Sequence, residues 1–303
     1  MYILKSVIIK TPATTANLGP GFDCLGIALD LWNELKVTEG DFSIEIEGEG
    51  VNQIPLDSRN LIVTGLEAVF NYIGKKPKKY SYICNNKIPF SRGLGSSSAA
   101  IVSGLLAGSV LSGANLDKET LVNLASEIEG HPDNVAPAIY GGFTIGLKEQ
   151  NKWIIDEVSI SKEVNAILFI PNFYIDTHQS RSNLPENISR SDVIYNIARV
   201  ALLINSFNKQ SFNLLNIATK DKIHQPYRSG NIPGYQSIVK GAIKGGANGV
   251  YISGSGPTIV AITRGKEVTV RYEMAEAARL SQVEGESIIV PISDTGAFID
   301  SYE

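Results

Sequence analysis

One stretch constrains this chain more than any other: IPFSRGLGSSSAAIVSG, residues 88–104, where two glycines and three consecutive serines stand directly before an apolar helix. Glycine loses more conformational freedom on folding than any other residue, so this composition indicates a need for bare backbone. A strand, a glycine-rich loop and a helix N-terminus together form an anion site, because the first helical turn has unpaired N–H groups and the helix dipole adds partial positive charge. The stretch predicts a phosphate site; a tight turn with a serine N-cap is the structural alternative.

Three common phosphate-binding patterns do not fit this stretch. The P-loop pattern fails because Gly74-Lys75 and Gly265-Lys266 are not followed by serine or threonine. The dinucleotide fingerprint fails because Ser98 stands where its third glycine belongs. The H-R-D and D-F-G motifs of protein kinases are missing as well. The loop therefore belongs to another class of phosphate site.

Composition narrows the setting of the protein. A chain of 303 residues with 43% hydrophobic and 19% charged residues is typical of a globular protein of one large domain or two ordinary ones. The net charge of −4 argues against nucleic acid as a partner. Two cysteines are too few for a disulfide framework, and the apolar runs are too short for a signal peptide or a membrane helix. We expect a cytoplasmic protein without a membrane partner.

The apolar pattern predicts an α+β fold in which strands alternate with helices and antiparallel returns. Residues 35–37 and 42–46 are expected to form a hairpin, and Ser191 is expected to cap the helix that follows it. Expected helices cover residues 60–72, 97–111, 116–128, 192–207 and 267–280. Expected strands include residues 6–10, 80–83, 138–147, 166–170, 250–253, 258–263 and 287–291. The polar stretch 150–163 suggests a domain boundary, which we place at residue 155.

Three motifs together resemble those of the GHMP kinases. The ATP-binding motif of this family is similar to Pro89-x-x-x-Gly93-Leu94-Gly95-Ser96-Ser97-Ser98-Ala99. The first motif of the family is similar to PATTANLGPGFD at residues 12–23, and its third motif is similar to SGSGPT at residues 253–258. Together with EGHPDNVAPAIYGG at residues 129–142, these variants resemble the homoserine kinases. The resemblance implies residues 1–155 as an ATP-binding domain like the second domain of ribosomal protein S5, and residues 156–303 as a ferredoxin-like domain.

The resemblance also implies ATP and Mg²⁺ at the glycine-serine loop. Mg²⁺ prefers oxygen ligands and keeps several waters, so Ser97 and Glu129 would suffice to hold it. Ser98 and Glu127 are the alternatives to these two ligands. The residues expected to contact ATP are Asn60, Lys87, Pro89, Ser91, Arg92, Gly93, Leu94, Gly95, Ser96, Ser97, Ser98 and Ala99.

The implied substrate is L-homoserine, which carries an ammonium, a carboxylate and a hydroxyl. Asn17 and Asp23 match positions that hold the amino end, and arginines suit the carboxylate because a guanidinium binds it with two hydrogen bonds. The residues expected at the substrate are Asn17, Asp23, His131, Asn134, Thr177, Arg181, Arg228 and Gly254. His178 and His224 are interpreted as structural histidines.

Asn134 stands where several relatives have an aspartate base. An amide cannot take up a proton, so we expect direct attack of the substrate hydroxyl on the γ-phosphate, with Asp133 as an alternative base. The catalytic residues expected are Ser97, Glu129 and Asn134.

Two other functions stay open at this point. Another small-molecule GHMP kinase, such as one for mevalonate, would leave Asp23 without a purpose, because mevalonate has no ammonium. A non-catalytic relative would have no need for the intact loop and Glu129. A homodimer is a further possibility.

Overall fold

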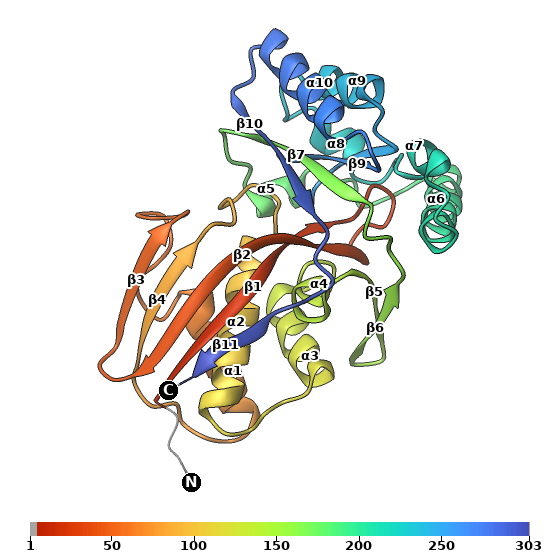
Figure 1. The fold of residues 1–303 in the computed structure, drawn as a ribbon. Helices are drawn as coiled ribbons and strands as arrows, with labels where there is room; N and C mark the ends of the chain where they lie inside the picture. Colours follow the sequence, from red (N-terminus) through yellow and green to blue (C-terminus); the bar gives the residue numbers. More distant parts are fainter. Residues whose placement is uncertain (1–4, 303) are drawn as a thin grey trace.

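The computed structural model describes residues 5–302, apart from the side chains of residues 177 and 178. A seven-stranded sheet forms the first half (Figure 1). Its main strands lie in the order β11-β1-β2-β4-β3, and the long β2 also pairs with the hairpin β5–β6. The bounds are β1 Ser6–Ala16, β2 Leu25–Glu39, β3 Ser43–Gly48, β4 Tyr80–Asn86, β5 Phe143–Glu149, β6 Lys152–Val158 and β11 Phe298–Tyr302.

Helices α1 (Leu61–Tyr72), α2 (Ser96–Leu111), α3 (Lys118–Glu129) and α4 (Val135–Tyr140) cover one face of this sheet (Figure 1). The small residues of α2 have a packing role: a Cβ at Gly104 would overlap the carbonyl of Ile62, and one at Gly65 would overlap that of Ile101. The backbones of α1 and α2 thus approach closely, and the Thr11 and Ser103 hydroxyls, 2.7 Å apart, link α2 to β1. This packing fixes the N-terminus of α2 beside the sheet.

The second half is a four-stranded antiparallel sheet in the order β10-β7-β9-β8. The strands are β7 Asn165–Pro171, β8 Gly249–Ile252, β9 Ile259–Thr263 and β10 Gly285–Pro291. Helices α9 (Tyr235–Gly245) and α10 (Glu267–Leu280) pack on one face. The opposite face shares an apolar core with β2 and β5, which joins the two halves. The remaining helices are α5 Thr177–Ser182, α6 Arg190–Asn208, the 3-10 turn η1 Phe212–Leu214, α7 Leu215–Ala218 and α8 Gln225–Ser229.

The α+β class is confirmed, but three local expectations are wrong. Residues 35–37 and 42–46 form no hairpin, because β4 lies between β2 and β3 and pairs with both. Residues 138–140 belong to α4, and the strand begins only at Phe143 after two glycines with positive φ. The cap of α6 is Ser189, whose hydroxyl accepts from the Asp192 N–H, rather than Ser191.

The chain ends in the first sheet and not in the second. The strand β11 pairs antiparallel with β1, so the last segment returns to the half in which the chain began (Figure 1). The expected boundary at residue 155 falls inside β6. The two-domain division therefore stays a prediction. None of the described helices has the length and apolar character needed to cross a membrane.

Candidate active site

The three motif segments meet in one place. The backbone N–H of Thr14 donates to the carbonyl of Leu94 over 3.1 Å, and that of Gly254 donates to the carbonyl of Ala16 over 3.3 Å. The Ser253 hydroxyl lies 2.5 Å from the Gly93 carbonyl oxygen and 2.8 Å from Thr15 Oγ1. Segments that are far apart in the sequence thus form one continuous floor.

The glycines of the loop allow this convergence. Gly93 and Gly95 have φ values of +76° and +72°, in the left-handed region that favours glycine. A Cβ at Gly93 would overlap the carbonyl oxygen of Ser253, and one at Gly95 would overlap Thr14 Oγ1. Gly93 and Gly95 must therefore lack a side chain for the three motif segments to come into contact.

The N-terminus of α2 lacks a side-chain cap. Its N-cap is Gly95, whereas α1 and α3 are capped by the side chains of Asn60 and Asp117. The N–H groups of the first turn of α2 therefore lack protein acceptors within the described part of the chain. They open into a cleft whose lining includes residues 93–98. An uncapped helix N-terminus in a cleft is suited to an anion.

Glu129 reaches the serines of the loop from the end of α3. The Ser97 hydroxyl donates to Glu129 Oε2 over 3.0 Å, and the Ser98 hydroxyl to Glu129 Oε1 over 3.0 Å. Glu127 is exposed and lines a separate hollow with Asp117 and Lys152. A carboxylate and hydroxyls together are oxygen donors that fit Mg²⁺, so the residues present suit this metal at Glu129 rather than at Glu127.

Asn134 lines the cleft next to Gly95. Its Oδ1 accepts from Thr14 Oγ1 over 2.7 Å, and its Nδ2 donates to Asp133 Oδ1 over 3.3 Å. The buried Asp133 also lies 2.6 Å from Nδ1 of His131. Burial lowers the pKa of His131, but the hydrogen bond to Asp133 and the nearby acidic charges outweigh this, and the net pKa is raised. Both contacts are thus made with the same oxygen of Asp133, Oδ1.

Charged side chains from both halves form the far end of the cleft. The Arg181 guanidinium binds Asp23 with two hydrogen bonds of 2.7 and 2.8 Å, and this bond raises the pKa of Arg181. Burial, together with the charge of Arg181, lowers the pKa of Arg228 to about 10. Both guanidinium groups lie 5.3 Å from the ring centroid of Phe22.

The loop before β2 holds Asp23 in a strained conformation. Asn17, Leu18 and Asp23 all have positive φ, which is uncommon for residues other than glycine. Asn17 stabilises the loop, since its Oδ1 accepts from the Asp23 N–H and its Nδ2 donates to the Gly254 carbonyl. Strain of this kind concentrates at binding sites, where surrounding contacts hold it in place.

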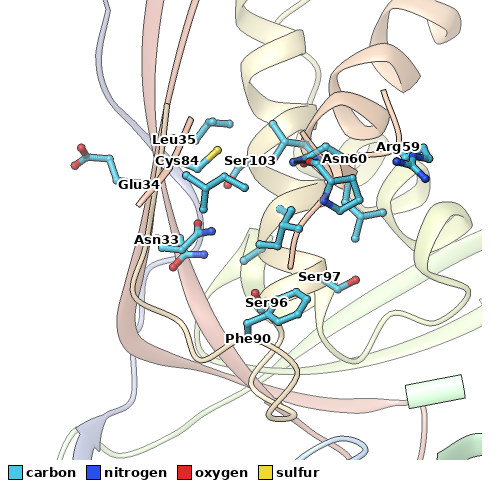
Figure 2. Close-up of a pocket in the computed structure, with 18 residues that line it drawn as sticks. Asn33, Glu34, Leu35, Arg59, Asn60, Cys84, Phe90, Ser96, Ser97 and Ser103 are labelled. Carbon is cyan, nitrogen blue, oxygen red and sulfur yellow. Dashed lines mark hydrogen bonds between the residues drawn. The ribbon is translucent and has the colours of Figure 1, made fainter. Parts of the chain in front are cut away.

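A mostly apolar pocket adjoins the cleft. Figure 2 shows it between the sheet, which provides Asn33, Leu35 and Cys84, and the N-terminal ends of α1 and α2. Phe90, Ser96 and Ser97 line both this pocket and the cleft, so the two spaces adjoin at these residues. The pocket walls also include Ile46, Ile54, Pro55, Ile62, Ala99 and Ala100.

Most of the expected site residues line these two spaces. Asn60 and Ala99 line the pocket, whereas Ser91, Arg92, Leu94, His131, Arg228 and Gly254 line the cleft. The Arg92 guanidinium is turned away to the Pro171 carbonyl and the Tyr174 ring. Lys87 is exposed, and neither Lys87 nor Pro89 lines either space. The Thr177 side chain lies outside the described part of the structure.

Sequence reasoning missed several contributors. Thr14 and Thr15 were within the first motif, and their hydroxyls could have signalled the contacts to Asn134 and Ser253. Phe22 was also within the first motif, but the motif gave no indication of its contacts with Arg181 and Arg228. The apolar pocket had no distinguishing signal, because its wall residues resemble those of a core. His224 was interpreted as structural, yet its ring contacts Arg228.

Comparison with known proteins agrees with this geometry. Residues 60–142 match the model of the GHMP kinases N terminal domain and residues 200–280 that of the GHMP kinases C terminal. A homoserine kinase of Crocosphaera subtropica is 36% identical over 100% of both chains, and one of Carboxydothermus hydrogenoformans is 43% identical over 86% of this chain and 87% of its own. The chain belongs to the homoserine kinase family. Its fold is the GHMP kinase fold, and members of this family are phosphotransferases.

A solved structure supports the family assignment. The homoserine kinase of Cytophaga hutchinsonii matches with a TM-score of 0.89 and 26% identity, covering 99% of this chain and 98% of its own. The similarity thus extends over both sheets and over the cleft between them.

Proposed function

We propose that this homoserine kinase relative transfers the γ-phosphoryl group of ATP to the hydroxyl of L-homoserine, giving O-phospho-L-homoserine on the route to threonine. One observation carries the proposal: the same cleft has an uncapped helix N-terminus at one end and a paired carboxylate and guanidinium at the other. The first suits a polyphosphate, and the second suits a zwitterion. A cytoplasmic location and a homodimer remain predictions.

The nucleotide would lie across both spaces. The triphosphate would bind the backbone N–H groups at the start of α2, where the loop leaves room for it. The base would enter the apolar pocket of Figure 2, past Phe90 and Ser96. Ser97 and Glu129 would hold Mg²⁺, which when bound neutralises charge on the phosphates.

The ammonium and carboxylate of homoserine would replace the existing ion pair between Asp23 and Arg181. Asp23 and Arg181 neutralise each other in the structure, with 32% and 43% of their side-chain surfaces exposed. The ammonium of homoserine can pair with Asp23 while its carboxylate pairs with Arg181 and Arg228, so both charges keep a partner. A substrate that lacks either charge leaves one partner unpaired beneath it, which costs about 2–5 kcal/mol. This difference favours an amino acid over mevalonate.

Asn134 would orient the substrate hydroxyl without taking its proton. Its amide is fixed by Thr14 and Asp133, and an amide is no proton acceptor at ordinary pH. Phosphoryl transfer depends mainly on positioning and charge stabilisation, so the γ-phosphate itself can accept the proton as the bond forms. Asp133 is less suited to this role because His131 and Asn134 already bind its Oδ1.

A substrate panel tests the function. Purified protein with ATP and Mg²⁺ is assayed for ADP release with L-homoserine, L-serine, mevalonate and γ-hydroxybutyrate, the deaminated analogue of homoserine. We expect release to depend on L-homoserine and to be far slower with the others. Equal activity with mevalonate, or no ADP release with any of these alcohols, would contradict the proposal.

A further inference from the structure

His224 has no part in the mechanism above, yet both of its ring nitrogens are engaged. The side chain is completely buried at the N-cap of α8, outside the cleft lining. Its Nε2 lies 2.7 Å from the carbonyl oxygen of Gly19, and its Nδ1 lies 3.2 Å from Nη1 of Arg228. The ring also stacks on Phe22, with centroids 5.2 Å apart. His224 therefore contacts both the loop that carries Asp23, through Gly19, and the guanidinium of Arg228.

The partners of His224 define its protonation state. A carbonyl oxygen only accepts, so Nε2 carries the proton; a guanidinium only donates, so Nδ1 is the unprotonated acceptor. Only the neutral imidazole with its proton on Nε2 satisfies both contacts. Burial, followed by the charge of Arg228, lowers the pKa of His224, and these effects outweigh the carboxylates of Asp221 and Asp23. The ring therefore stays neutral where Arg228 needs an acceptor.

Arg228 is held on one side only. Nη1 donates to His224 and, over 2.8 Å, to the carbonyl of Gly254, while no described residue accepts from Nη2. The guanidinium is thus anchored through Nη1, whereas Nε and Nη2, which have no acceptor among the described residues, remain for a ligand in the cleft that Arg228 lines.

We propose that His224 is a positioning residue: its neutral ring, acting as acceptor at Nδ1, fixes the Arg228 guanidinium in the orientation that receives the substrate carboxylate. This inference rests on the proposed function, in which Arg228 binds that carboxylate. It assigns to a buried histidine outside the cleft an effect on homoserine affinity that is exerted through Arg228, and no effect on ATP affinity.

Two amide variants separate the ring nitrogens. In His224→Asn the side-chain oxygen can lie near the former Nδ1 and accept from Arg228, whereas in His224→Gln the longer amide can reach the former Nε2 and donate to Gly19. His224→Leu removes both contacts. A hydrogen bond to a charged group affects binding by about 10- to 100-fold. We expect the KM for homoserine to rise by that factor in His224→Leu and His224→Gln, and by less than about 3-fold in His224→Asn.

The KM for ATP and the melting temperature serve as internal controls for folding. A positioning role predicts that the KM for ATP stays within about 2-fold in every variant that melts cooperatively. If His224→Gln keeps the KM for homoserine and His224→Asn loses it, the contact with Gly19 is what matters and the proposal is overturned.

A double-mutant cycle completes the test. In an Arg228→Met background, which keeps the bulk of the side chain, His224→Gln should add almost nothing to the KM for homoserine. An equal factor in both backgrounds would mean that His224 does not act through Arg228, and would overturn the inference alone. If Arg228→Met by itself leaves the KM for homoserine unchanged, the proposed carboxylate site is wrong, and the inference fails with it.

Discussion

The two ends of the cleft are built to bind charge in different ways. At the proposed phosphate end the donors are backbone N–H groups in the first turn of α2, set by the glycines of one short loop. At the proposed amino-acid end the charges are side chains, and the paired Asp23 and Arg181 are separated by 158 positions in the sequence. A backbone site is encoded in a local motif, whereas a side-chain site exists only after the fold has formed.

The two ends also differ before any ligand binds. Among the described residues, the N–H groups in the first turn of α2 have no protein acceptor, so this helix end suits an anion before any ligand binds. Asp23 and Arg181 form an ion pair with each other, so the charges of these two side chains are already paired before an amino acid binds. Substitutions at the first end should therefore affect ATP, and those at the second should affect the amino acid.

The largest effect is expected at Gly95, where the backbone itself forms the site. In Gly95→Val the side chain would overlap Thr14 and force the left-handed residue out of its conformation, so ATP binding measured by calorimetry should be lost.

Gly113 provides the matched control for Gly95. It has a similar φ of +74°, with open space around its missing Cβ. Gly113→Val should cost about 1 kcal/mol of stability and leave ATP affinity unchanged. The milder Gly95→Ala applies if the valine variant does not fold. A folded Gly95 variant with wild-type ATP affinity would refute the backbone site.

The next effect concerns Glu129, the carboxylate that accepts hydrogen bonds from Ser97 and Ser98. Glu129→Gln keeps the shape of the side chain and removes its charge, so kcat should fall by roughly 100-fold or more, as expected when charge stabilisation at a metal is lost. Glu127→Gln, on the exposed face of the same helix, should change kcat by no more than about 2-fold. The reverse order of these two rates would place the metal at Glu127.

The smallest effect is expected at Lys87. Its side chain is exposed and lines neither the apolar pocket nor the cleft, although the family resemblance led us to expect contact with ATP. An exposed charge is worth about 0–1 kcal/mol, so Lys87→Ala should weaken ATP binding by at most about 5-fold in a titration. A larger loss would show that Lys87 moves onto the nucleotide.

Sequence patterns predicted those elements whose signal is local. The expected helix 267–280 coincides with α10, and the apolar helix after the loop is α2. The pairing partners of the strands were harder to predict from the sequence, because β4 lies between β2 and β3 although it follows both in the chain. The strand β11 gave no signal, since all five of its residues are exposed and its partner lies at the other end of the sequence.

The candidate site likewise has residues that a local motif indicates and contacts that form only in the folded chain. Gly93, Gly95 and Ser97 could be assigned from a contiguous motif and from family resemblance. The Asp23–Arg181 pair could not be predicted as a pair, because each was expected to meet the substrate rather than the other. The role of His224 depends on the tautomer that Gly19 and Arg228 impose, and no spacing in the sequence reveals this.

The most direct test of the account is a double-mutant cycle between Asp23 and the substrate amino group. The kcat/KM values for L-homoserine and γ-hydroxybutyrate are measured with the wild-type protein and with Asp23→Asn. Loss of one partner of a covered ion pair costs about 2–5 kcal/mol, so Asp23→Asn should lower kcat/KM for homoserine by roughly 30- to 4,000-fold, while the affinity for ATP is unchanged. The wild-type protein should discriminate strongly against the deaminated analogue, and the variant much less. Strictly additive losses, with no coupling between residue 23 and the amino group, would contradict the account.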